Sequence, residues 1–304
     1  MTEGKYYLTL DRQGMENPNR AQPLFPCSIY QRDVHQYLTG EIPPHWHREL
    51  ELFFLEKGHV RILLGVKTSE LLPGEGYFAN SNLLHGIFCL TDAPCCYHSI
   101  VFDPSILAGE PGSVFDVRYV RPFLKHGKPG FKITGDDEKT SPLFSLFQKA
   151  YQICEHPDIT GYELSARNAL SDLFLFLAQN ITETPQTSSP SLQEQRMKQM
   201  VSWMEEHYRE PFSVSQFAND TGLGIRQCQR SFSGFFHSTP IHYLTRRRIA
   251  AATELLISTD LPVIQIGIQC GFENPSYFAK QFKKIIGMSP REYRNQNPQN
   301  PLRF

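Results

Sequence analysis

The sequence predicts a protein of two fold classes, a β barrel with a pair of helices in the N-terminal part and an all-α domain in the C-terminal part. Its length of 304 residues is typical of two domains. Short apolar runs interrupted by Gly, Pro and Asn precede residue 105, whereas apolar residues recur at helical spacing from residue 142 onward. The polar segment TETPQTSSP at 182–190 has the composition of a linker. We therefore expect one domain at 1–181 and another at 191–304.

Four short apolar runs are expected to form strands of the barrel, which we place at about 20–135. They are Glu51–Leu55, Val60–Leu64, Gly76–Ala79 and His98–Phe102. Several short strands at close spacing are typical of a sandwich or a small barrel. Residues 106–135 contain Pro and Gly throughout, and we expect loops and one strand there.

Two helices are expected within about 141–181, at Pro142–Cys154 and Tyr162–Asn180. Apolar residues recur at helical spacing in both. The first stripe is Leu143, Leu146, Phe147, Ala150, Tyr151 and Cys154, and the second is Leu164, Ala169, Leu170, Leu173, Leu177 and Ile181. We expect the helices to cover one face of the barrel. The same stripe also suits pairing with a second copy of the chain, so a homodimer is a possible assembly.

The C-terminal domain begins with an amphipathic helix at Ser191–Tyr208, which Pro211 ends. Ser213 and Gln216 then have the spacing of a capping box. A short helix at Val214–Asp220 follows, and a turn at Gly222 separates it from a helix at about Ile225–Phe236. Helix, tight turn and helix over about 213–236 form a helix-turn-helix.

The same pattern repeats at about 261–286. Its parts are a short helix at Leu261–Cys270, a turn at Gly271, a cap at Asn274-Pro275 and an amphipathic helix at Ser276–Ile286. A helix at Ile241–Ser258, which would be about 27 Å long, joins the two units. That length suits two recognition helices about one DNA turn apart, roughly 34 Å. A further capping box at Ser289–Glu292 opens a last short helix.

The charge of the two parts differs in sign. Residues 190–304 carry 14 lysines and arginines against 9 acidic residues, while residues 1–189 carry 16 against 22. A basic C-terminal domain favours nucleic acid as its partner. Phe232, Phe235, Phe272, Phe278 and Phe282 fall at helical spacing, and we expect them in the core rather than on a stacking surface.

The second unit reads Ile264-Gln-Ile-Gly-Ile-Gln-Cys-Gly-Phe-Glu-Asn-Pro-Ser-Tyr-Phe-Ala-Lys-Gln-Phe-Lys-Lys-Ile-Ile-Gly-Met-Ser-Pro-Arg-Glu-Tyr-Arg294. This stretch resembles the second helix-turn-helix of the AraC/XylS family of transcription regulators almost position for position. The resemblance covers residues 192–294. Two residues depart from it, since Gly224 stands where the family has a Ser cap and Gly267 where Ala is usual. Both glycines should loosen the local helix by about 1 kcal/mol or less.

This resemblance implies that one helix of each unit enters the major groove of promoter DNA. The exposed residues would be Arg226, Gln227, Gln229 and Arg230 on the first helix, and Ser276, Tyr277, Lys280 and Gln281 on the second. Arg and Gln can make bidentate contacts with guanine and adenine. Lys280 suits a base or a phosphate equally. At least one of Arg246, Arg247 and Arg248 should pair internally or face a phosphate.

Two N-terminal segments contain histidines. The first is Gly40-Glu-Ile-Pro-Pro-His45-Trp-His47-Arg-Glu-Leu-Glu51, with Gly58, and the rings of its His-x-His pair would share one face of a strand. The second is Pro73-Gly-Glu-Gly76, with His85. They resemble the two motifs of the cupin fold, a double-stranded β-helix barrel. In cupin enzymes the positions of His45, His47, Glu51 and His85 hold a divalent metal, and this donor set suits Zn, Fe, Mn or Ni.

In cupin sensor domains joined to AraC-type domains, the resemblance implies a small-molecule pocket without a metal or another cofactor. The pocket residues would be His45, Trp46, His47, Glu51 and His85. Tyr30, Tyr37 and Phe53 are further aromatic candidates for stacking on a sugar ring, although aromatic residues on strands are more often core. Alternatively, the His and Glu side chains serve to stabilise the barrel.

Seven cysteines without a C-x-x-C pair indicate reduced thiols. The N-terminus has no signal-peptide pattern, and no apolar run reaches the roughly 20 residues that span a bilayer. We expect a cytoplasmic bacterial activator that is not an enzyme, has no membrane partner, responds to a small metabolite such as a sugar, and acts with RNA polymerase. The alternatives are a metal-dependent cupin enzyme, such as an isomerase or dioxygenase, fused to a DNA-binding domain, and a ligand-independent regulator.

Overall fold

The computed structural model describes residues 24–181, 191–236 and 238–297, together with residues 8, 10, 11, 15, 16 and 18. These residues form two compact units. The β unit holds the described residues of Met15–Val34 and Pro44–Glu194, and the helical unit holds those of Met1–Gly14, His35–Pro43 and Gln195–Phe304. The expected linker at 182–190 lies outside the described residues.

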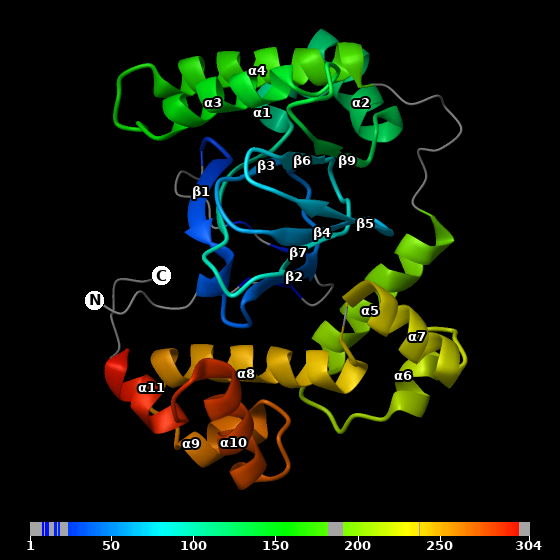
Figure 1. The fold of residues 1–304 in the computed structure, drawn as a ribbon, viewed down its shortest axis with the longest axis vertical. Helices are drawn as coiled ribbons and strands as arrows, with labels where there is room; N and C mark the ends of the chain where they lie inside the picture. Colours follow the sequence, from blue (N-terminus) through cyan, green and yellow to red (C-terminus); the bar gives the residue numbers. More distant parts are fainter. Residues whose placement is uncertain are drawn as a thin grey trace. The chain divides into compact units, whose positions relative to one another are not determined.

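The strands form two antiparallel sheets (Figure 1). The five-stranded sheet has the order β1 (Cys27–Asp33), β8 (Cys96–Phe102), β3 (Leu50–Leu55), β6 (Gly76–Ala79) and β9 (Gly130–Ile133). The four-stranded sheet has the order β2 (Glu41–His45), β7 (His85–Cys89), β4 (Val60–Leu64) and β5 (Lys67–Leu71). This confirms the expected β-sheet-rich N-terminal domain. Two of the four predicted strands match, and the other two begin one and two residues earlier than predicted.

The main core of the β unit lies between the five-stranded sheet and the helices α3 (Pro142–Cys154) and α4 (Tyr162–Asn180) (Figure 1). Alternate residues of β3 point to opposite faces. Leu50, Leu52 and Phe54 therefore pack with the buried residues of both helices. Glu51 and Phe53 are left on the other face, toward the second sheet. The helices begin and end at the predicted residues and cover the sheet as expected.

Leu164 corrects the predicted stripe of α4. Its side chain is 68% exposed, whereas Ala166, Leu170 and Leu173 are buried. At 3.6 residues per turn, position 164 lies about 160° around the helix from Ala166, so it cannot share that face.

The segment 106–135 also corrects an expectation, because it contains helices where mainly loops were expected. These are α1 (Ser105–Ala108), a π-helix at Asp116–Val120 and α2 (Arg121–His126); β9 is the one expected strand. Buried Leu107, Val120 and Phe123 fix the segment to the core. Such short helices depend on this packing, since isolated helices of this length are marginal in water.

The helical unit contains α5 (Leu192–His207), whose first three residues belong to the β unit, and two helix-turn-helix pairs. The pairs are α6 (Val214–Asp220) with α7 (Ile225–Phe236), and α9 (Val263–Gln269) with α10 (Pro275–Ile286). Figure 1 shows them at the two ends of α8 (Pro240–Ser258), and α11 (Pro290–Gln296) follows. The 19 residues of α8 span about 28 Å. The expected pair of motifs is therefore confirmed.

Phenylalanine rings fill the interior of both pairs as predicted. Phe232, Phe272, Phe278 and Phe282 are buried, whereas Phe235 is only half-buried. The predicted capping box at Ser289 is complete, with hydrogen bonds between Ser289 and Glu292 in both directions. Ser213 accepts from the Gln216 amide at 3.4 Å, but the described bonds lack the reciprocal one. Within the described residues, none of the helices has both the length and the apolar run that crossing a membrane requires.

The glycines that depart from the AraC pattern differ in their surroundings. A Cβ atom on Gly224, just before α7, would meet nothing within 4 Å, whereas one on Gly267 would lie 2.8 Å from Cδ1 of Phe278. Gly267 thus makes room for a core ring.

We expect Gly224→Ser to raise the free energy of unfolding by a few tenths of a kcal/mol, about 0.3, through a better N-cap. Gly267→Ala should instead leave it unchanged or lower it, because overpacking at about 1–3 kcal/mol offsets a helix-propensity gain of about 1 kcal/mol. Urea unfolding of the two variants measures this difference, and an equal gain in both would contradict the assignment for Gly267.

Candidate nucleic-acid interface and histidine cluster

One side of α7 carries the four residues predicted for DNA contact. Arg226, Gln227, Gln229 and Arg230 are all exposed. The opposite side carries Cys228, Phe232 and Phe236, all of them buried. This division follows from the helical period, which separates the two sets.

The helix α10 repeats this arrangement. Ser276, Tyr277 and Lys280 are exposed and Gln281 is half-buried, while Phe278, Phe282 and Ile286 are buried. The carboxamide of Asn274 accepts hydrogen bonds from the backbone amides of Ser276 and Tyr277 at 2.9 and 3.0 Å, which fixes the start of the helix.

The cations on these two helices are available to a ligand. Among the described residues, none forms an ion pair or side-chain hydrogen bond with Arg226, Arg230 or Lys280. An exposed, unpaired guanidinium or ammonium is the group that contacts phosphates and guanine edges. Each helix-turn-helix therefore presents a positively charged outer face.

The three consecutive arginines of α8 have internal partners instead. Arg248 donates to the backbone carbonyls of Tyr208 and Glu210, both at 2.6 Å. The Nε atom of Arg247 lies 2.5 Å from a Glu205 carboxylate oxygen. Arg246 pairs with Glu41.

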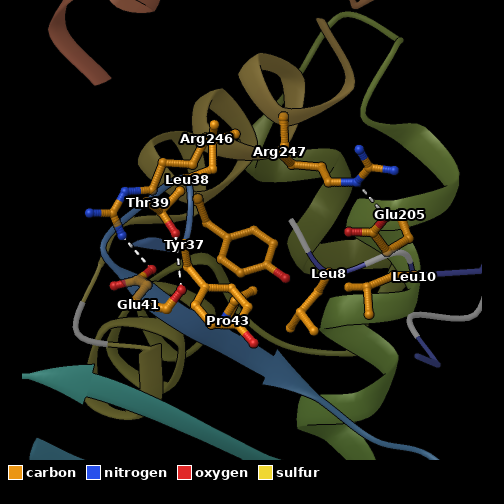
Figure 2. A pocket seen from close by; sticks show the side chains of 12 residues that line it. Leu8, Leu10, Tyr37, Leu38, Thr39, Glu41, Pro43, Glu205, Arg246 and Arg247 are labelled. Atoms are coloured by element: carbon orange, nitrogen blue, oxygen red, sulfur yellow. Dashed lines mark hydrogen bonds and ion pairs between the residues drawn. The ribbon is translucent and has the colours of Figure 1, made fainter. Parts of the chain in front are cut away.

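Figure 2 shows the pairs of Arg246 and Arg247 at the edge of a cavity that is lined by Tyr37, Leu38 and Pro43 among other residues. Its volume is about 40 Å³, so it has room for a few water molecules at most. Burial raises the pKa of Glu41 despite the opposing charge of Arg246. We read this cavity as a packing feature of the helical unit rather than as a metabolite site.

The β unit brings together the four residues that match the cupin motifs. The ligand atoms of His45, His47 and His85 lie within 4.8 Å of one another, and all three residues are buried. Oε2 of Glu51 lies 2.9 Å from Nε2 of His85 and 3.4 Å from Nε2 of His47. Because Glu51 belongs to one sheet and His45 and His85 to the other, the cluster lies between the sheets.

The backbone fixes the orientation of two rings in this histidine cluster. Nδ1 of His85 donates to the carbonyl of Leu83 at 2.8 Å, and Nδ1 of His47 donates to that of Glu49 at 3.2 Å. In the neutral form their Nε2 atoms then carry lone pairs that point into the cluster. Neither Nε2 atom has a well-formed hydrogen bond. This is the arrangement found in metal-ligating histidines, whose second nitrogen is held by a carbonyl or carboxylate.

Two carboxylates beside the histidines, those of Glu51 and Glu16, have lowered pKa values. Burial raises the pKa of Glu51, but the nearby His47 and His85 outweigh burial and hold that pKa well below its usual range. Glu16, whose Oε2 lies 3.4 Å from Nε2 of His45, likewise has a lowered pKa, because the interaction with His45 and His47 exceeds the effect of burial. Both acids are thus held ionised beside the histidines.

The sequence did not reveal Glu16, which lies far from the motifs and carries no periodic signal. Trp46, predicted beside the histidines, is buried, but strand alternation places it on the opposite face from His45 and His47. Phe53 is stacked between Tyr77 and Tyr97, with ring centroids 4.9 and 4.7 Å away, so it is core rather than a platform for a sugar.

A larger hollow lies elsewhere in the β unit, where α3 meets β3 and β8. It has a volume of about 430 Å³, and its lining includes Phe54, His98, Phe144, Tyr151 and Glu155. That volume falls within the range of small-molecule pockets, about 300–1,000 Å³. No sequence motif marks this hollow, because its residues come from three separate elements.

Comparison with known proteins gives two family matches. Residues 34–174 match the AraC-like ligand binding domain, and residues 217–296 match a helix-turn-helix domain. An uncharacterized HTH-type transcriptional regulator of Bacillus subtilis, YdeC, is 26% identical over 274 residues, or 90% of this chain and 92% of that protein. The HTH-type transcriptional activator RhaS of Escherichia fergusonii is 29% identical over 44% of this chain and 48% of RhaS.

Two solved structures match different lengths of this chain. The DNA-binding domain of AdpA, crystallised with a target DNA, is 30% identical with a TM-score of 0.32, over 33% of this chain and 91% of that one. ToxT from Vibrio cholerae is 12% identical with a TM-score of 0.39, over 90% of this chain and 98% of that one.

Proposed function

We propose that α7 and α10 read promoter DNA. The premise is that this chain belongs to the AraC family of transcription regulators, which bind DNA through two helix-turn-helix motifs and carry a ligand-binding domain. The residues assigned to this role are Arg226, Gln227, Gln229 and Arg230 on α7, and Ser276, Tyr277, Lys280 and Gln281 on α10. The supporting observation is the exposed, unpaired cations on the outer face of both helices. Alanine variants at these positions test the assignment, as argued in the Discussion.

We propose further that a small metabolite, such as a sugar, binds at the histidine cluster and that the protein then activates transcription together with RNA polymerase. Three imidazoles and two carboxylates offer donors and acceptors for hydroxyl groups. The name of RhaS, an activator, supports the direction of regulation. The hollow beside α3 is a second candidate for the metabolite site.

Strand β2 continues along the chain from the helical unit to the histidine cluster, and we propose that it transmits ligand binding to α8, the helix that joins the two helix-turn-helix pairs. His45 ends this strand, and Glu41 begins it and pairs with Arg246 of α8. Strand alternation places Glu41 and His45 on the same face. A ligand that moves His45 would shift the equilibrium between the formed and the broken Glu41–Arg246 ion pair. A ligand regulates a protein by binding one of two such states more tightly than the other.

The metabolite proposal predicts a specific thermal shift. Screening the intact protein against a panel of sugars should reveal one that raises the melting temperature, because binding to the folded state stabilises it by mass action. His45→Ala with His47→Ala should abolish the shift, whereas Phe144→Ala, in the hollow, should leave it intact. The reverse pattern would move the metabolite site to the hollow. Promoter occupancy that stays unchanged across the panel and in a protein without the β unit would refute sensing altogether.

Glu41→Gln separates binding from response in the same assay. It should retain the thermal shift but change the dependence of promoter occupancy on the sugar, because the charge that Arg246 meets is removed. A response equal to that of the unaltered protein would exclude β2 as the route.

A metal-dependent enzyme is the second candidate function. The observation that favours it is the set of metal-ligating side chains in the histidine cluster. His45, His47, His85 and Glu51 would hold a divalent ion, which would supply Lewis acidity there. Elemental analysis of the purified protein decides between the two. A stoichiometric metal that is lost in His45→Ala with His47→Ala supports the enzyme, and a protein without metal supports the sensor, for which we assign no cofactor.

We also propose the assembly, location and boundaries of the protein. The boundaries follow the sequence: a sensor domain at 1–181, a linker at 182–190 and a DNA-binding domain at 191–304.

The absence of a membrane-crossing helix from the described residues and the family's contact with DNA agree with a cytoplasmic location. Because most of the predicted apolar stripe of α3 and α4 packs against the sheet, a homodimer would pair the remaining faces of these helices, and sedimentation analysis at several concentrations tests it.

A further inference from the structure

Two cysteines far apart in the sequence meet inside the β unit. Sγ of Cys27 lies 3.9 Å from Sγ of Cys154, across a separation of 127 residues. Cys27 is the first residue of β1 and Cys154 the last of α3. The other described cysteines, Cys89, Cys95, Cys96, Cys228 and Cys270, have no such contact with Cys27 or Cys154. A disulfide needs its sulfurs about 2.05 Å apart, so each would move by about 1 Å.

The contact makes the two thiols chemically different. The hydrogen bond with Cys27 has the largest effect and lowers the pKa of Cys154; burial opposes it, and the Tyr162 hydroxyl adds to the lowering. The same contact raises the pKa of Cys27. Cys154 is therefore the better nucleophile, since the thiolate is the reactive form.

Burial restricts which oxidant can reach the pair. Cys27 and Cys154 are 7% and 5% exposed, too little for a bulky disulfide such as oxidised glutathione. A small peroxide needs no more than transient opening at the ends of β1 and α3. The end of an element is where local opening costs least.

We propose that Cys27 and Cys154 form a peroxide-responsive dithiol that closes to an internal disulfide. The Cys154 thiolate attacks one peroxide oxygen, the O–O bond breaks, and hydroxide leaves and becomes water on protonation; Cys154 is then a sulfenic acid. Cys27 attacks that sulfur, the S–O bond breaks, and the second oxygen leaves as water with the proton of Cys27. Overall, two thiols and hydrogen peroxide give one disulfide and two waters, and two electrons pass from the dithiol to the peroxide.

The disulfide would fasten α3 to the five-stranded sheet. Cys27 belongs to an edge strand of that sheet, and Cys154 ends the helix that packs on it. The bond would close a loop of more than 120 residues, and long loops gain most from a cross-link. We expect the oxidised β unit to melt about 5 °C or more above the reduced one.

Peptide mass spectrometry of the full chain tests the proposal. The reduced protein is treated with hydrogen peroxide, its remaining thiols are alkylated, and it is digested without reductant. We expect a linked peptide containing Cys27 and Cys154 to become the main product, to disappear with dithiothreitol, and not to form with oxidised glutathione. Alkylation of both residues while the more exposed Cys89 and Cys96 oxidise would overturn the proposal.

Three variants separate this chemistry from a general effect on folding. Cys27→Ser should stop the reaction at a Cys154 sulfenic acid, which dimedone traps. Tyr162→Phe keeps the ring but removes the hydroxyl, and it should slow formation of the link several-fold. Cys228→Ser is the matched control for a buried cysteine elsewhere and should leave the link unchanged. Equal dimedone labelling at Cys154 and Cys228 in the Cys27→Ser protein would refute a special reactivity of Cys154.

Discussion

Replacing Arg230 and Lys280 together by alanine is expected to weaken binding to a cognate promoter fragment about 100- to 1,000-fold, because a base contact accounts for about 1–3 kcal/mol. Both side chains are exposed on the outer face of their helices, away from Phe232 and Phe282. Their loss would therefore remove the proposed contacts with DNA without opening the core. Fluorescence anisotropy with a labelled fragment measures the effect, and footprinting checks that the protected region is lost.

A charge-matched variant controls for the loss of two positive charges. Lys125→Ala with Lys139→Ala removes the same charge from exposed positions of the β unit and should leave the affinity nearly unchanged. Unaltered protection of the fragment by the Arg230→Ala, Lys280→Ala protein would refute the assignment of α7 and α10 as recognition helices.

Salt dependence distinguishes the two roles that Lys280 can have. The logarithm of the binding constant falls with the logarithm of salt concentration by about 0.9 for each phosphate that the protein neutralises. If Lys280 contacts a phosphate, Lys280→Ala should reduce that slope by about 1 and weaken all sequences alike. If it contacts a base, the slope should change little and the preference at one position of the site should relax.

The helices of this protein could be predicted closely because local chemistry marks their ends. Asn274 and Ser289 accept hydrogen bonds from the first turns of α10 and α11, and Gly222 and Gly271 adopt the positive φ that ends α6 and α9. The prediction for the segment 106–135 was mostly wrong. The short helices there depend on the packing of Phe123 and its neighbours rather than on capping residues or an apolar period in the sequence.

The candidate sites could be predicted where sequence spacing fixes geometry. The His-x-His pattern brought His45 and His47 onto one face, and the structure adds Glu51 and His85 as expected. Glu16 and the Cys27–Cys154 pair were missed, since only the folded chain brings such distant residues together. The acceptors of Arg248 were missed too, because backbone carbonyls leave no trace in a sequence.

Arg248 connects the two helix-turn-helix pairs. Its guanidinium binds the carbonyls of Tyr208 and Glu210, in the segment that leads into the first pair. It also lies over the ring of Phe272, 5.8 Å from the centroid, in the turn of the second pair. The neighbouring Gly271 packs so closely that a Cβ there would lie 2.7 Å from the Tyr208 carbonyl oxygen. One buried side chain thus holds the segment at 208–210 between both motifs.

Arg248→Ala is expected to lower the free energy of unfolding of the helical unit by about 2–4 kcal/mol, because the buried carbonyl of Tyr208 and the part-buried carbonyl of Glu210 lose a charged donor at about 1–3 kcal/mol each. Arg248→Lys keeps the charge but offers a single donor group in place of the planar fork, so it should recover only part of that loss. Arg226→Ala, an exposed arginine of α7, is the control for simple truncation and should change stability by less than about 0.5 kcal/mol.

Urea unfolding followed by the fluorescence of Trp203, in a Trp46→Phe background, reports on the helical unit alone, because Trp203 lies in α5. Separating the units matters, since a protein of two domains need not unfold in a single step. DNA binding by Arg248→Lys, which stays folded, should also weaken, because the spacing of α7 and α10 depends on the segment that Arg248 holds. An Arg248→Ala protein as stable as the Arg226→Ala control would mean that water replaces the guanidinium at no cost, and Arg248 would then not be the link between the two motifs.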